Sequence, residues 1–199
     1  YRLSGEAKAP AQIQDVKAAV RFLRAKAIEY KLNPEKFGAW GGSAGGSLVS
    51  LLGTSCSVTE LEGAELGNAE QSSCVQAVVD WFGPIDFLQM DPQFTGTSCP
   101  VNHDAADSPE SQLVGGPIQE NVDAVKLVNA MTYITSDDPA FFIQHGTADC
   151  NVPPQQSQLF YDALSSTIGV DKVTLTMLDG AGHGGSQFTT EENLNLVID

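Results

Sequence analysis

Basic residues are scarce in this 199-residue sequence, which has ten Lys and Arg against 25 Asp and Glu and a formal net charge of −15. Nucleic acids and anionic membrane surfaces are themselves negative and would repel such a chain. No apolar run approaches the roughly 20 residues that a membrane-spanning helix needs. We therefore expect neither a nucleic-acid partner nor a membrane partner.

The sequence also lacks internal repeats, low-complexity tracts and a visible signal peptide, although Tyr1 need not be the natural start of the protein. Its 42% hydrophobic content is typical of a single globular domain, or most of one. Four cysteines and an acidic surface rich in Ser, Thr and Gln favour an exported protein with disulfide bonds.

The glycine-rich stretch at residues 41–46, with the sequence GGSAGG, is the strongest local signal. It is not a phosphate-binding loop, because that motif needs Lys where this chain has Ser47. It is not a dinucleotide-binding G-x-G-x-x-G either, because no two of its glycines are two positions apart. It fits G-x-S-x-G between a short apolar run and a helical run, which is the context of a nucleophile elbow with Ser43 at its tip. The alternative is a flexible glycine-rich loop.

Apolar runs and helical patterns alternate along the rest of the chain. Residues 1–3 resemble the end of a strand, and the helix expected at 11–31 places Ile13, Val16, Val20, Leu23 and Ala27 on its apolar face. The expected strands are 37–40, 75–80, 140–145 and 172–178, and further helices are expected at 47–52, at 154–168 and after a capping box formed by Thr189 and Glu192.

Residues 85–136 lack strand character and contain Asp, Pro, Gly and short helical patches. This segment is too long for a simple loop, so we interpret it as an insertion over the strand ends and call it the cap segment. Strands that alternate with helices predict a mostly parallel sheet covered on both faces. The sequence therefore predicts an α/β fold with a cap insertion.

Three candidate residues each follow a different expected strand. They are therefore expected at the carboxyl ends of the strands, where the active sites of such folds lie. They occur in the order Ser43, Asp149, His183, which is the order of an α/β-hydrolase triad. His183 would take the proton of the Ser43 hydroxyl as it attacks a carbonyl, and Asp149 would orient the imidazole. The N–H of Ala44 would donate to the negative oxygen that forms.

Each role has competitors. We expect His145, at the end of an apolar strand, to be a hydrogen-bonded structural histidine, and His103 to orient the cap segment or line a pocket. Asp179 is the alternative acid, followed by Asp137 and Asp138, whereas Asp80 precedes the cap segment and is expected to be structural.

Six motifs resemble the α/β-hydrolase esterase and lipase group, and are closest to its bifunctional xylan deacetylase/feruloyl esterase subfamily. They are residues 1–4 (YRLS), 41–46 (GGSAGG), 80–84 (DWFGP), 107–111 (DSPES), 145–149 (HGTAD) and 180–184 (GAGHG). The resemblance implies hydrolysis of carboxylic esters by a secreted or periplasmic serine esterase, with acetyl or feruloyl groups on plant cell-wall xylan as plausible substrates. It implies no cofactor and no metal ion.

Within the matched motifs, Gly42, Trp81 and Phe82 are expected to contact the small-molecule or polysaccharide ester. The family also has an N-terminal His-Gly-Gly segment that supplies a second oxyanion donor, and this sequence contains none. We therefore expect residues 1–199 to be a partial catalytic domain that lacks its N-terminal strands and turns over esters slowly by itself.

The four cysteines allow three pairings. Cys56 and Cys74 bracket an irregular segment, and Cys150 follows the proposed acid while Cys99 lies in the cap segment. We predict the pairs Cys56–Cys74 and Cys99–Cys150, the alternative being four buried thiols in a cytosolic enzyme.

Two other functions share these features. A serine peptidase of the prolyl-oligopeptidase type has the same fold, elbow and triad order. A binding module built on an inactive hydrolase fold would normally have lost one of Ser43, Asp149 and His183, all of which are present.

Overall fold

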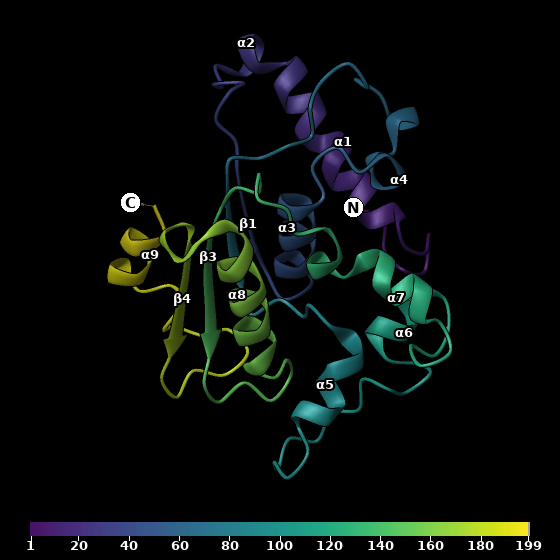
Figure 1. Ribbon diagram of the computed structural model, residues 1–199, viewed down its shortest axis with the longest axis vertical. Helices are drawn as coiled ribbons and strands as arrows, with labels where there is room; N and C mark the ends of the chain where they lie inside the picture. Colours follow the sequence, from purple (N-terminus) through teal and green to yellow (C-terminus); the bar gives the residue numbers. More distant parts are fainter. Residues whose placement is uncertain (199) are drawn as a thin grey trace.

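The centre of the structure is a four-stranded, all-parallel sheet in a computed structural model that describes residues 1–198. Its strands lie side by side in sequence order, and the chain crosses back through helical segments between them (Figure 1). The predicted parallel α/β architecture is confirmed. The strands are β1 (Gly38–Gly42), β2 (Ala77–Trp81), β3 (Ala140–Gly146) and β4 (Val173–Leu178).

Helices before and after the elbow, in the cap segment and beyond β3 surround this sheet. The α-helices are α1 (Ala11–Ala25), α2 (Ala27–Tyr30), α3 (Ala44–Thr54), α4 (Thr59–Glu62), α5 (Phe87–Gln93), α6 (Pro109–Val114), α7 (Val122–Val128), α8 (Gln155–Ile168) and α9 (Glu191–Ile198). Three short 3₁₀ helices are η1 (Ala64–Leu66), η2 (Ala130–Tyr133) and η3 (Val170–Lys172). Among residues 1–198, no helix combines the length and the apolar character needed to cross a membrane.

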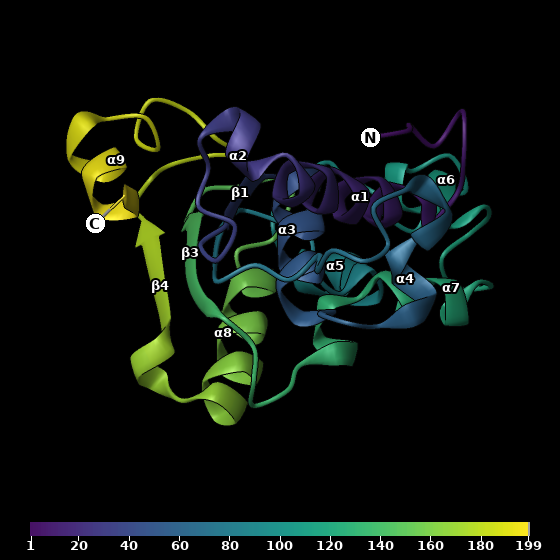
Figure 2. The same cartoon turned by 90° about the horizontal axis from the view of Figure 1, so that it is seen from above.

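The two faces of the sheet are covered by different helices. Phe141 of β3 packs against Gly53 of α3 and, with 5.5 Å between ring centroids, against Phe160 of α8. Successive strand residues point to opposite faces, so Gln144 lies on the other face, where it exchanges hydrogen bonds with Asn193 of α9. Figure 2 shows α9 and α8 on either side of β3 and β4.

The cap segment is tied to the turn after β3. It contains α5, α6, α7 and η2, and in Figure 1 it lies on the side of the molecule away from β4. One disulfide joins its Cys99 to Cys150, and a second joins Cys56 to Cys74 after α3. This is the predicted pairing, and each bridge fastens an irregular segment to the sheet–helix framework.

Three local predictions were wrong. Residues 1–3 form no strand, because Leu3 O instead accepts hydrogen bonds from Glu6 N and Ala7 N in a turn. The helix expected at 11–31 is interrupted at Lys26, and α2 ends in left-handed backbone at Lys31. The last helix is capped by Thr190, whose Oγ1 accepts from Asn193 N, rather than by Thr189.

The buried side of α1 also differs from its predicted apolar face. Leu23 is 37% exposed, whereas Lys17 and Arg21 are fully buried. Both cations reach Glu62 of α4: Lys17 Nζ lies 2.7 Å from Glu62 Oε1, and Arg21 Nη1 lies 3.2 Å from Glu62 Oε2. Tertiary charge pairing has overridden the apolar periodicity of this helix.

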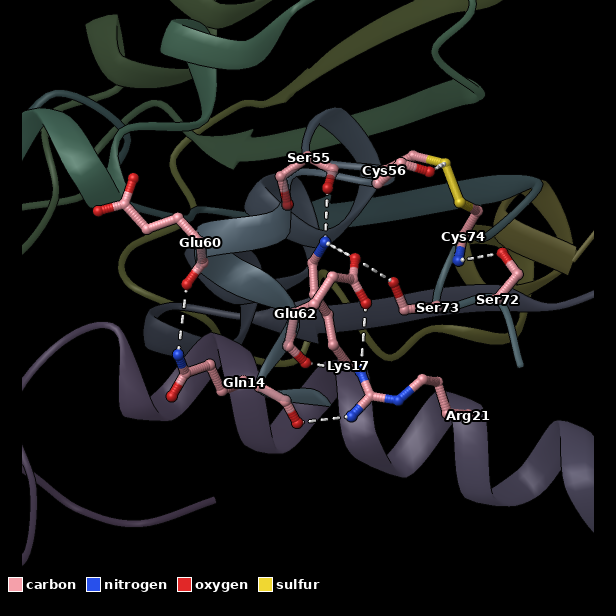
Figure 3. A network of polar contacts seen from close by, with 12 residues as sticks. Gln14, Lys17, Arg21, Ser55, Cys56, Glu60, Glu62, Ser72, Ser73 and Cys74 are labelled. Carbon is pink, nitrogen blue, oxygen red and sulfur yellow. Dashed lines mark hydrogen bonds and ion pairs between the residues drawn. A yellow bond between two sulfur atoms is a disulfide. The ribbon is translucent and has the colours of Figure 1, made fainter. Parts of the chain in front are cut away.

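Figure 3 shows how this buried charge cluster joins three segments. Lys17 also donates to Ser55 O at the end of α3, and Arg21 donates to Gly63 O and Gly67 O. Ser73 donates to Glu62 Oε1 beside the Cys56–Cys74 disulfide. The cluster therefore holds the irregular segment 55–74 against α1 and the C-terminal end of α3.

Replacing Glu62 with glutamine is expected to lower the free energy of unfolding by about 3 kcal/mol, because it leaves two buried cations without their counter-charge. Urea denaturation measures this loss. The matched control is Glu29→Gln, which breaks the exposed Lys26–Glu29 pair and should cost less than about 0.5 kcal/mol. Equal losses in the two variants would contradict the structural role of the cluster.

Candidate active site

Ser43 lies at a tight turn between β1 and α3, in the strand–turn–helix setting of a nucleophile elbow. Its backbone has φ 56° and ψ −123°, a strained conformation for a residue with a side chain. Two backbone hydrogen bonds hold the turn, from Ser43 N to Trp81 O at 2.9 Å and from Ser47 N to Ser43 O at 3.0 Å. The strain is thus imposed by the sheet on one side and by the helix on the other.

Glycine is required where the strand and the helix approach each other most closely. A Cβ on Gly41 would overlap the carbonyl of Gly45, and a Cβ on Gly46 would overlap the Asp80 carboxylate. The sequence signature requires glycine only at positions 41 and 45. The requirement for glycine at position 46 comes from the three-dimensional structure, which leaves no room there for a side chain. Asp80 itself accepts from Gly83 N at 3.0 Å, and its burial raises the pKa of the carboxyl to about 6.

The structure brings the Ser43, His183 and Asp149 side chains into one hydrogen-bonded chain. His183 Nε2 lies 2.8 Å from Ser43 Oγ, and His183 Nδ1 lies 2.7 Å from Asp149 Oδ2. These residues follow β1, β4 and β3 respectively, so three strand ends meet at one edge of the sheet. This arrangement can remove a proton from the Ser43 hydroxyl and stabilise the imidazolium that results.

Every acceptor position of Asp149 is used. Its Oδ1 accepts from the N–H groups of Asn151 and Val152, at 2.7 and 3.0 Å. Its Oδ2 faces His183 and, at 3.2 Å, His145 Nε2. Burial alone would raise the pKa of this carboxyl, but the hydrogen bonds from both histidines and both backbone amides outweigh it and hold the pKa well below its ordinary value. Asp149 is therefore ionised at neutral pH.

His145 is buried and hydrogen-bonded, as predicted, but it also faces the acid. Its Nε2 contacts Val152 O at 3.0 Å as well as Asp149 Oδ2, while Nδ1 lies 2.7 Å from Ser157 Oγ. Because a carbonyl oxygen only accepts, Nε2 carries the proton and donates to this side of the site. The only sequence signal for this contact is the four-residue spacing of His145 and Asp149 around a turn.

The alternative acids lie elsewhere. Asp179 is exposed, and its Oδ1 accepts a 3.4 Å hydrogen bond from Thr147 Oγ1. Asp137 is exposed, and the buried Asp138 accepts from Thr135 N and Thr135 Oγ1 in a turn before β3. The hydrogen bond to His183 is made by Asp149.

Aromatic side chains support the imidazole. The Phe82 ring lies 4.7 Å from the His183 ring, centroid to centroid, in an edge-on arrangement. Trp81 packs between Trp40 and Phe188, with ring centroids 4.7 and 5.3 Å away. These are packing contacts, and the expected substrate contacts of Gly42, Trp81 and Phe82 stay predictions.

A cavity of about 340 Å³ opens beside the first turn of α3. Ala44 and Ser47 form one wall, and apolar side chains of the cap segment and of residues 3–13 form most of the rest. Ala44 is the first residue of α3, so its N–H has no partner within the helix and is free to donate next to Ser43. The cavity can hold an apolar group attached to a carbonyl at Ser43.

Comparison with known proteins yields a consistent set of matches. A family model described as BD-FAE matches residues 1–164 of this chain. The probable carboxylic ester hydrolase LipM of Mycobacterium tuberculosis is 32% identical over 164 residues, and the esterase LipC of the same organism is 28% identical over 184. These matches cover 82% and 92% of this chain but 36% and 43% of the relatives, so the chain spans less than half of their length.

Solved structures match over nearly the whole chain. A bifunctional GH43-CE protein from Bacteroides eggerthii is 42% identical with a TM-score of 0.89, covering 100% of this chain and 26% of the other. A truncated carbohydrate esterase from gut microbiota is 34% identical with a TM-score of 0.88, covering 99% and 69%. An acetyl ester-xyloside bifunctional hydrolase from Caldicellulosiruptor lactoaceticus is 25% identical with a TM-score of 0.74, covering 96% and 64%.

Proposed function

Because this chain belongs to the BD-FAE family and has the α/β-hydrolase fold, we propose that the protein hydrolyses carboxylic esters through an acyl-enzyme on Ser43. The observation that carries the proposal is the continuous hydrogen-bond chain from Asp149 through His183 to Ser43. The esterase relatives support ester rather than amide substrates.

In the proposed mechanism His183 Nε2 accepts the Ser43 proton as Oγ attacks the ester carbonyl. Asp149 is already ionised and saturated with donors, so it needs no rearrangement to stabilise the imidazolium. The N–H of Ala44 donates to the tetrahedral oxyanion. His183 then protonates the departing alcohol. In the second half of the reaction His183 Nε2 accepts a proton from the water that attacks the acyl-enzyme and returns it to Ser43 Oγ as the carboxylic acid leaves.

We further propose that the alcohol is a sugar and the acyl group is acetyl or feruloyl, with plant cell-wall xylan as the polymer. Support comes from the carbohydrate esterases and the acetyl ester-xyloside hydrolase among the similar structures. The cavity beside Ala44 is apolar enough to receive such an acyl group. The two disulfides favour a secreted or periplasmic location for this activity.

The test is a side-by-side assay of the protein on acetylated xylo-oligosaccharides, feruloylated xylo-oligosaccharides and a peptide p-nitroanilide. Release of acetate or ferulate without cleavage of the anilide is the expected result. Cleavage of the anilide without ester hydrolysis would instead support a serine peptidase. The absence of both reactions, together with no covalent labelling by a fluorophosphonate, would support a binding module.

A further inference from the structure

A second histidine–carboxylate pair lies in the cap segment, next to the loop that carries Asp149. His103 Nδ1 lies 3.1 Å from Glu110 Oε2 of α6, and both side chains are about nine-tenths buried. His103 Nε2 lies 2.8 Å from the carbonyl oxygen of Asn151. Neither side chain is hydrogen-bonded to Ser43, but Glu110 also lines the cavity beside Ala44.

The protonation of His103 follows from its partners. A carbonyl oxygen can only accept, so Nε2 carries a proton and donates to Asn151 O. Nδ1 faces a carboxylate, which also accepts when ionised, so the pair is complete when Nδ1 is protonated as well. Burial alone would lower the pKa of His103, but Glu110, the Asn151 carbonyl and Asp91 outweigh it and raise the pKa above its ordinary value.

All titratable groups that face His103 are acidic. Glu110 approaches from α6, and Asp104 follows His103 directly in the chain. Asp91 of α5 accepts hydrogen bonds from the backbone N–H groups of His103 and Asp104, at 2.9 Å each. The Phe94 ring stacks on the imidazole, with 6.3 Å between centroids. The surroundings therefore hold the ring in place and favour its charged form.

The loop after β3 is held from the cap segment at two successive residues. Cys150 is bonded to Cys99, and the Asn151 carbonyl accepts from His103. The same loop turns inward to present the N–H groups of Asn151 and Val152 to Asp149 Oδ1. The Asn151 carbonyl and the Val152 N–H belong to one peptide group, so a rotation of that peptide would move one of the two donors that orient Asp149 toward His183.

We propose that His103, held in place by its ion pair with Glu110, is a positioning residue for Asp149: by holding the Asn151 carbonyl it fixes the adjoining Val152 N–H, a backbone donor that orients the acid. The inference rests on the proposed role of Asp149 in ester hydrolysis. It makes the cap segment part of the machinery that aligns the triad.

Variants at His103 and Glu110 test this role. His103→Leu removes the donor, and a shift of the acid by a fraction of an ångström should lower kcat on p-nitrophenyl acetate roughly tenfold with KM changed less than about twofold. His103→Gln keeps an N–H donor without a titrating ring, so it should restore kcat to within about threefold of wild type. Glu120→Gln, an exposed carboxylate of the same segment, is the matched control for Glu110→Gln and should have no effect.

The pH dependence separates positioning from packing. The pKa of His103 is raised, so its charge is present at low pH and is lost as the pH rises through that value. The ratio of kcat in wild type to kcat in His103→Gln should therefore fall with rising pH. Without the Glu110 carboxylate the pKa of His103 should fall, so in Glu110→Gln the charge on His103 is lost at a lower pH. As the pH is raised, the contribution of His103 to kcat should therefore disappear earlier in this variant than in wild type.

Two further readouts do not depend on activity. In His103→Leu the amide protons of Asn151 and Val152 should exchange with solvent roughly tenfold faster, and the low-field proton resonance of His183 Nδ1 should shift. If His103→Leu keeps wild-type amide exchange, His183 resonance and kcat, His103 is structural and the inference is wrong, even when thermal stability falls. A wild-type protein without ester turnover would contradict the proposed function, while amide exchange still tests the positioning role.

Discussion

Replacing Ser43 with alanine is expected to reduce kcat for ester hydrolysis by about 10⁵-fold, because no other hydroxyl in the elbow can form the acyl-enzyme. The fold should be retained. Alanine has the same Cβ in the strained backbone, and the one side-chain hydrogen bond lost is that to His183 Nε2. The free energy of unfolding should therefore change by less than about 1 kcal/mol.

Initial rates on p-nitrophenyl acetate, together with urea denaturation, measure both quantities. Ser166→Ala is the matched control, since Ser166 is exposed on α8 and donates only to Ala163 O. It should retain wild-type rates. A Ser43→Ala protein that keeps more than about a tenth of the activity, beyond any trace of wild-type contamination, would exclude Ser43 as the nucleophile.

Replacing Asp149 with asparagine is expected to reduce kcat by about 10⁴-fold. The backbone around the acid determines how the new amide group is oriented. Because Asn151 N and Val152 N both donate to Oδ1, the amide carbonyl of the new residue must occupy that position. Its NH₂ group then points at His183 Nδ1 and donates to it. This fixes the tautomer with a proton on Nε2, which cannot accept the proton of Ser43.

Asp179→Asn is the control for the acid, because Asp179 follows β4 and precedes the His183 loop but is exposed and accepts from Thr147. Its rate should stay within about twofold of wild type. Circular dichroism and thermal unfolding of both variants show whether the folds are comparable. If Asp179→Asn loses activity and Asp149→Asn keeps it, the assignment of the acid is reversed.

The parts of the site that local sequence could predict are those whose constraints are local. The elbow needs small residues at fixed offsets around Ser43, and the strand β1 and helix α3 on either side are short continuous patterns. Strand ends in a parallel sheet meet at one edge, so the placement of His183 and Asp149 followed from their position after strands. The disulfide pairing could be inferred because each bridge connects an irregular segment to a neighbouring fixed point.

The features that local sequence could not predict depend on contacts between distant segments. Lys17 and Arg21 occupy the buried side of α1 because Glu62, about forty residues later, neutralises them. An apolar periodicity rule has no means of finding such a partner. The link from His103 to Asn151 is likewise set by how the loop after β3 folds against the cap segment.

These contacts also change how the site works. An acid with only one histidine partner would depend on that partner for its orientation. Here Asp149 has two backbone donors and two histidines around it, with its pKa held well below the ordinary value. Its charge therefore stays constant over the pH range in which esters are hydrolysed near neutrality.

Covalent labelling of the nucleophile tests the central claim most directly. The protein would be reacted with a fluorophosphonate, digested, and analysed by mass spectrometry to locate the phosphonylated residue. The account predicts one adduct, on the Ser43 side chain, and its loss in the Ser43→Ala variant and after prior incubation with an ester substrate that accumulates as acyl-enzyme. An adduct on any other serine, or a folded wild-type protein that takes up no label while it hydrolyses esters, would contradict it.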